Sequence, residues 1–144
     1  MTLAGGCLCG DVRYSVEAEP VGTGVCHCRT CRRSAGAPMV GWITWTRADV
    51  KIGGDTKVFV SSTHGQRHHC PRCGTQLFFV DADYPDEIDV THASLDDPDA
   101  ITPAKHIWAE SKVGWVKLDD GLPVWAQRSV GDNAQLLTPA RDPA

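Results

Sequence analysis

Two short segments, Cys7-Leu8-Cys9-Gly10 near the N-terminus and Cys70-Pro71-Arg72-Cys73-Gly74 in the middle of the chain, give the strongest indication of the fold. Each segment has two closely spaced cysteines followed by glycine, which lets the chain turn sharply while backbone N–H groups approach the sulfurs. Four thiolates complete the tetrahedron that zinc prefers, with Zn–S bonds of about 2.3 Å. Such a site staples distant segments together, because metal-binding energy becomes folding energy. The predicted ligands of this structural zinc are Cys7, Cys9, Cys70 and Cys73.

Two other interpretations of the Cys-x-x-Cys pair remain open from the sequence. Cys70 and Cys73 can form a thioredoxin-like redox pair, or they can bind an iron–sulfur centre. A redox pair of that type is expected next to a strand–helix–strand unit. Residues 75–80, Thr-Gln-Leu-Phe-Phe-Val, instead have the composition of a strand. This context favours structural zinc.

A second cluster, Cys26-His27-Cys28-Arg29-Thr30-Cys31, places three thiols within six residues. Three protein ligands leave one tetrahedral position open, which is typical of a catalytic zinc rather than a structural one. We therefore predict that Cys26, Cys28 and Cys31 hold a catalytic zinc. In an extended segment the side chain of His27 would point away from its two neighbours. The alternatives are that His27 is a fourth ligand, or that the cluster is structural and completed by His68, His69 or His106.

The cysteine count and the charge of the chain limit the classes of function. Seven cysteines cannot all pair within one chain, and their grouping favours metal ligands in a reducing compartment. We expect a cytoplasmic protein, because the N-terminus lacks the basic and apolar regions of a secretory signal. No apolar run approaches the roughly 20 residues that cross a bilayer. A net charge of -4 gives no reason to expect nucleic-acid binding.

Short segments with β character recur along the chain, which predicts a mainly β protein. The helix signal is limited to a short helix or tight turn over residues 28–35, before Gly36 and Pro38. Residues 126–144 are polar and contain two prolines, so we expect a loosely ordered C-terminal tail. The expected strands are residues 12–16, 39–45, 57–60, 76–80 and 87–92, with weaker candidates at 106–110 and 114–118.

Basic and aromatic residues provide further candidates. Arg29, Arg32 and Arg33 flank the second cluster, where they either form a solvated basic turn or bind carboxylates of an anionic substrate. His106 and Lys112 either orient a substrate or satisfy buried backbone groups. The five tryptophans are expected mainly in the core or against the sheet.

The sequence resembles the glutathione-dependent formaldehyde-activating enzymes and their centromere-protein-V-like relatives. The resemblance extends from about residue 3 to residue 125 and includes all seven cysteines. It also includes later segments such as His106-Ile107-Trp108 and Asp120-Gly121-Leu122-Pro123. The matching cysteine segments are Gly5-Gly6-Cys7-Leu8-Cys9-Gly10-Asp11-Val12-Arg13-Tyr14, Cys26-His27-Cys28-Arg29-Thr30-Cys31-Arg32-Arg33 and Arg67-His68-His69-Cys70-Pro71-Arg72-Cys73-Gly74.

The resemblance implies a single zinc-stapled β-tent-like domain over residues 3–125, with short helical turns. It implies two zinc ions per chain, a structural one on Cys7, Cys9, Cys70 and Cys73 and a catalytic, labile one on Cys26, Cys28 and Cys31. The implied activity is that of a carbon–sulfur lyase acting on glutathione–aldehyde adducts such as S-hydroxymethylglutathione. The expected partner is therefore a small thiol such as glutathione. The alternative is a non-catalytic zinc module that binds protein or nucleic acid.

Overall fold

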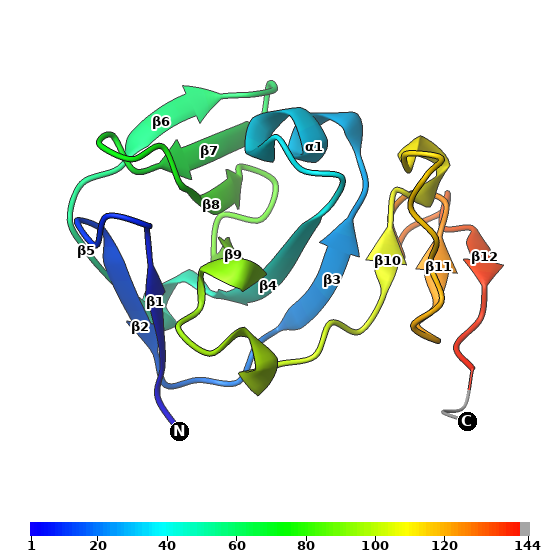
Figure 1. Ribbon diagram of the computed structural model, residues 1–144, viewed down its shortest axis with the longest axis horizontal. Helices are drawn as coiled ribbons and strands as arrows, with labels where there is room; N and C mark the ends of the chain where they lie inside the picture. The colour runs from blue at the N-terminus through cyan, green and yellow to red at the C-terminus, as the bar shows by residue number, and fades with distance from the viewer. Residues whose placement is uncertain (142–144) are drawn as a thin grey trace. The chain divides into compact units, whose positions relative to one another are not determined.

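The computed structural model describes residues 1–141 and has a mainly β fold with one short α-helix, as the sequence predicts (Figure 1). The chain forms two compact units. The first comprises residues 1–22 and 42–102, and the second comprises residues 23–41 and the chain from Pro103 onward. No helix within the described residues has the length and apolar character that crossing a membrane requires.

The first unit contains a small antiparallel sheet with the strand order β1-β2-β5. Its strands are β1 (Leu3–Gly6), β2 (Arg13–Val16) and β5 (Val50–Gly53). Along β2, Tyr14 and Val16 are buried, whereas the intervening Ser15 is half-buried and Arg13 is exposed. This alternation turns one face of the strand toward the core, as the period of two predicts.

A larger antiparallel array in the same unit has the order β4-β9-β8-β7-β6. Trp45 on β4 is fully buried, and its indole N–H donates to the carbonyl of Ala18 at 3.0 Å. A short 3-10 turn, η1 (Arg47–Asp49), links β4 to β5, and two more, η2 (His92–Ser94) and η3 (Pro98–Ala100), follow β9. The strands are β4 (Val40–Thr46), β6 (Lys57–Val60), β7 (Gly65–His69), β8 (Gln76–Asp81) and β9 (Glu87–Thr91).

The core of the first unit combines apolar residues from both strand groups. Tyr14 and Phe78 meet edge to face with ring centroids 5.6 Å apart, and the Tyr14 hydroxyl lies 2.7 Å from Ser94 Oγ. Gly5 on β1 forms an isolated antiparallel bridge with Leu95, the residue that follows η2. The buried core residues include Cys7 and Cys70, so the first cysteine cluster lies at the edge of this core.

The second unit contains α1 (Arg29–Ala35) and four short strands in the order β12-β11-β10-β3. Strand β10 is parallel to both β3 and β11, whereas β12 is antiparallel to β11. A 3-10 turn, η4 (Ala109–Ser111), follows β10. The strands are β3 (Gly22–Cys26), β10 (His106–Ile107), β11 (Val124–Trp125) and β12 (Leu136–Thr138).

Helix α1 begins and ends where the sequence indicates. The N-cap is Cys28, whose sulfur accepts a hydrogen bond from the Cys31 N–H, in the way that N-cap side chains satisfy first-turn donors. The C-cap is Gly36, whose left-handed φ of 61° suits glycine. Arg32 and Arg33 in the last turn complement the negative end of the helix dipole.

The strand expected over residues 114–118 is wrong. Lys112 Nζ donates to the Val113 carbonyl at 3.1 Å and to the Val116 carbonyl at 2.7 Å, so this segment curls around the ammonium group. The strand expected over residues 106–110 is limited to His106–Ile107, because Trp108 has a left-handed φ of 58°.

The segment expected as a tail, residues 126–144, contains β12. The backbone of β12 pairs with β11, so part of the segment is ordered within the second unit. Residues 142–144 lie outside the described residues, so the expectation of a loose tail is not addressed there.

Candidate metal centres

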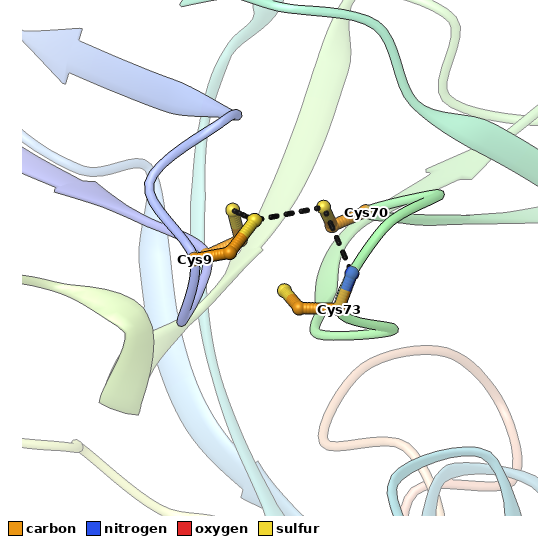
Figure 2. A group of neighbouring side chains, drawn as sticks. Cys9, Cys70 and Cys73 are labelled. Carbon is orange, nitrogen blue, oxygen red and sulfur yellow. Dashed lines mark hydrogen bonds between the residues drawn. The ribbon is translucent and has the colours of Figure 1, made fainter.

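The sulfurs of Cys7, Cys9, Cys70 and Cys73 all lie within 4.8 Å of one another. The Cys7 and Cys9 sulfurs are 3.6 Å apart, and those of Cys9 and Cys70 are 3.7 Å apart. A tetrahedron with metal–sulfur bonds of about 2.3 Å has edges of about 3.8 Å. Figure 2 shows the side chains of Cys9 and Cys70 converging from two loops, with Cys73 beside them. The sulfur spacing therefore fits a four-thiolate zinc site.

Two similar turns present these sulfurs. In the first, the Gly10 N–H donates to the Cys7 carbonyl at 3.1 Å, and the Val12 N–H donates to Cys7 Sγ at 3.3 Å. In the second, the Gly74 N–H donates to the Cys70 carbonyl at 2.9 Å. Gly10 and Gly74 have φ values of 85° and 79°, which other residues rarely adopt. The glycine after each cysteine pair is thus required by the turn.

Thr75 joins the two turns. No local pattern in the sequence indicates this role. Its Oγ1 accepts a hydrogen bond from the Leu8 N–H at 3.1 Å and lies 3.2 Å from Cys73 Sγ. Hydrogen bonds from the side chain and backbone of Thr75 lower the pKa of the Cys73 thiol to about 5. Cys73 is therefore held in the thiolate form that a metal binds.

The second cluster contains the sulfurs of Cys26, Cys28 and Cys31, which also lie within 4.8 Å of one another. Cys26 ends β3, Cys28 caps α1 and Cys31 lies in its first turn, so the strand-to-helix transition gathers all three. Cys26 and Cys31 are buried, whereas Cys28 is half-buried. The cluster is therefore most accessible at Cys28.

The crowding of three thiols has an electrostatic consequence. Hydrogen bonds with Cys28 and Cys31, followed by burial, raise the pKa of the Cys26 thiol well above its ordinary range. Three thiolates in this space repel one another unless a cation compensates their charge. A soft divalent cation is the group that such a set of sulfurs fits.

The histidines do not join either sulfur cluster within residues 1–141. His27 turns instead to His106, with its Nε2 at 2.9 Å from His106 Nδ1. His68 and His69 lie on β7 in the first unit, where His68 Nδ1 is 2.8 Å from Thr56 Oγ1. The expectation that the side chain of His27 points away from the sulfurs agrees with this arrangement.

The arginines that follow the second cluster have different environments. Arg32 Nε donates to the His27 carbonyl at 3.4 Å, so this side chain folds back onto the cysteine segment. Arg29 and Arg33 are exposed. Two guanidinium groups on this short helix therefore face solvent close in sequence to Cys28.

The fold and the two clusters define a mainly β protein with one four-sulfur and one three-sulfur candidate metal centre. The model of the glutathione-dependent formaldehyde-activating enzyme family matches residues 2–111, which include both clusters. The chain belongs to this family, as its resemblance indicates.

Two relatives and one solved structure give the comparison more detail. A Halomonas elongata protein that carries the family's name is 31% identical over 130 residues, covering 83% of this chain and 82% of the relative. An uncharacterized lyase of Schizosaccharomyces pombe is 29% identical over 76 residues, covering 53% of this chain and 56% of that protein. The crystal structure of a Rhodobacter sphaeroides protein is similar with a TM-score of 0.55 and 25% identity, covering 69% of this chain and 91% of that one.

Proposed function

We propose that this protein is a zinc-dependent carbon–sulfur lyase that acts on adducts of glutathione with an aldehyde, such as S-hydroxymethylglutathione. Membership of the family supports the thiol substrate, and the name of the yeast relative supports the lyase class. The observation that carries the proposal is the difference between the clusters. Among the described residues, one cluster has four sulfurs and the other has three.

The two clusters would have different roles. Cys7, Cys9, Cys70 and Cys73 would hold a structural zinc, because four thiolates close the tetrahedron. Cys26, Cys28 and Cys31 would hold the second zinc. When bound there, the ion supplies an open position at which a thiol is kept in its thiolate form.

The residues of the second unit control access to this centre. Cys26 and Cys31 are buried, so the surrounding residues shield these two side chains from water. Cys28 is half-buried and leaves one side for a substrate. Arg29 and Arg33 are exposed near it in sequence, and their guanidinium groups suit the carboxylates of glutathione.

The proposed reaction balances without a further reactant. The thiol sulfur forms a bond to the aldehyde carbon, the carbonyl π bond breaks, and the thiol proton ends on the new hydroxyl oxygen. Holding both reactants together converts a bimolecular step into an effectively unimolecular one. The reverse reaction breaks the same carbon–sulfur bond, which is the lyase direction. A reducing compartment such as the cytoplasm would keep the seven thiols available for this role.

The experiment follows the exchange of ¹³C-formaldehyde with S-hydroxymethylglutathione by NMR. The wild-type chain is expected to raise the exchange rate well above that of buffer, and Cys28→Ser is expected to abolish the increase while the β fold remains. Arg47→Ala, an exposed arginine in the first unit, serves as the matched control and should leave the rate unchanged. A wild-type chain with both metals bound and no effect on exchange would support the non-catalytic zinc module instead.

A further inference from the structure

Asp120, His106 and His27 form a chain of hydrogen bonds inside the second unit. His106 Nε2 lies 2.7 Å from Asp120 Oδ2, and His106 Nδ1 lies 2.9 Å from His27 Nε2. His27 and His106 are buried, with 0% and 2% of their surface exposed, whereas Asp120 is half-exposed. A polar chain of this kind therefore connects the surface to the middle of the Cys26-His27-Cys28 segment.

The carboxylate sets the direction of this chain. An ionised carboxylate only accepts hydrogen bonds, so the Nε2–H of His106 donates to Asp120. With both rings neutral, His106 Nδ1 is then an acceptor, and it receives the Nε2–H of His27. Each imidazole is thereby fixed in one tautomer and one orientation.

The backbone of His27 is held as firmly as its ring. The His27 N–H donates to the Ile107 carbonyl at 3.0 Å, and the His27 carbonyl accepts from Arg32 Nε at 3.4 Å. Strand β10 runs parallel to β3, with Ile107 opposite Cys26. His106 and Ile107 therefore hold one residue through its side chain and its backbone, and both neighbours of that residue are cysteines of the three-sulfur cluster.

We propose that Asp120 and His106 are positioning residues, which hold the Cys26-His27-Cys28 segment in the geometry that the three-sulfur cluster needs to bind its ion. Carboxylate–histidine pairs orient metal ligands directly in many proteins, and loss of such partners typically lowers metal affinity about 10- to 100-fold. In this chain the pair acts on the residue between two ligands. The inference rests on the proposed function in one respect, that the three sulfurs bind a metal ion.

The test measures zinc release to a chromogenic chelator in the absence of substrate. The wild-type chain should release two ions in two phases, and the four-sulfur site is the internal standard. Asp120→Ala is expected to accelerate the faster phase about 10- to 100-fold and leave the slower phase unchanged. Asp120→Asn should restore the wild-type rate, because its amide oxygen can still accept from His106.

Two further variants separate positioning from other effects. Asp119→Ala removes the neighbouring carboxylate, which pairs with Arg141 at 2.7 Å, and should change neither phase. Asp120 also accepts from the Leu122 N–H at 3.1 Å, so His106→Phe is needed. His106→Phe breaks the hydrogen-bond chain but keeps the hydrogen bond between Asp120 and Leu122. This variant should accelerate the same phase of zinc release as Asp120→Ala.

The outcomes are distinct. Wild-type release rates in both Asp120→Ala and His106→Phe would overturn the inference, as would equal acceleration of the two phases. Because no substrate is present, the result does not depend on turnover. A further combination is that Asp120→Ala releases zinc faster as expected while the wild-type protein does not accelerate the exchange of formaldehyde. That combination would refute the proposed function and leave the positioning role intact.

Discussion

His27 Nε2 and His106 Nδ1 lie 2.9 Å apart although 79 positions separate the two residues in the sequence. This contact joins the cysteine segment after β3 to the strand β10. Burial, with a smaller contribution from the charge of Lys112, lowers the pKa of His27 to about 4. The imidazole is therefore neutral at physiological pH, which suits a hydrogen-bonding role beside a cluster of thiolates.

Replacing Cys70 should prevent stable folding. Cys70 is fully buried in the core of the first unit, and its sulfur is one of four that link two distant turns. Because metal binding supplies folding energy at such sites, Cys70→Ser is expected to yield little soluble protein. Circular dichroism and soluble yield measure this, with Cys28→Ser as the matched control that should keep the β spectrum. A Cys70→Ser chain that unfolds within a few degrees of the wild type would contradict the structural role.

Replacing Thr75 should weaken the first unit without changing its shape. Thr75→Val keeps the side-chain volume but loses the hydrogen bond from the Leu8 N–H and the contact with Cys73 Sγ. The expected cost is about 0.5–1.5 kcal/mol of unfolding free energy, the net value of a typical hydrogen bond, because water can still reach this exposed backbone N–H. Urea unfolding of the metal-loaded chain measures this. Thr138→Val, on the exposed strand β12, is the control, and an equal effect of both substitutions would argue against the bridging role of Thr75.

Adding a methyl group at Gly5 should disrupt the core. A Cβ at this position would lie 2.3 Å from the Tyr14 hydroxyl oxygen and 2.4 Å from the Ser94 carbonyl oxygen. Overpacking of this kind typically costs about 1–3 kcal/mol. Gly22→Ala is the matched control, since a Cβ there meets no atom within 4 Å. Thermal unfolding should show a lower midpoint for Gly5→Ala alone, and similar midpoints for both variants would exclude the close packing described.

The stability of the first unit should depend on pH through Asp89. Burial raises the pKa of this carboxyl to about 6 from its ordinary value of 3.8, although the Thr44 hydroxyl donates to it. Between these values the folded chain retains a proton that the unfolded chain has lost. The protonated carboxyl of Asp89 therefore makes its full contribution to stability below about pH 4, and this contribution is lost as the pH rises through 6.

Asp89→Asn removes this dependence, and its amide oxygen can still accept from Thr44. Relative to the wild type, the variant should gain stability between about pH 4 and pH 6 and keep a constant advantage of about 3 kcal/mol above that range. Denaturant unfolding at pH 4, 5, 6 and 7.5 measures the difference. An advantage that is the same at all four pH values would show that Asp89 does not titrate in this way.

The cysteine clusters and most of the central strands could be predicted from the sequence. The spacing of the cysteines is a local property that limits the geometry of ligands, and both sets converge as expected. Alternating or continuous apolar residues indicated β2, β4, β8 and β9. These signals suffice because they lie within short stretches of chain.

Other elements lacked such a signal. Strand β3 begins Gly-Thr-Gly, and β7 reads Gly-Gln-Arg-His-His, so neither has an apolar alternation; both are strands because their neighbours supply hydrogen bonds. The hydrogen bonds that connect Asp120 through His106 to His27 depend on the parallel pairing of β10 with β3. Thr75 was hidden for the same reason, because its partners Leu8 and Cys73 come together only in the folded chain.

We propose that the four-sulfur and three-sulfur clusters each hold one zinc ion. Elemental mass spectrometry of the purified wild type and of Cys28→Ser tests this by giving the zinc content per chain. We expect two ions per wild-type chain and one in Cys28→Ser. A single ion in the wild type, or two in the variant, would contradict it.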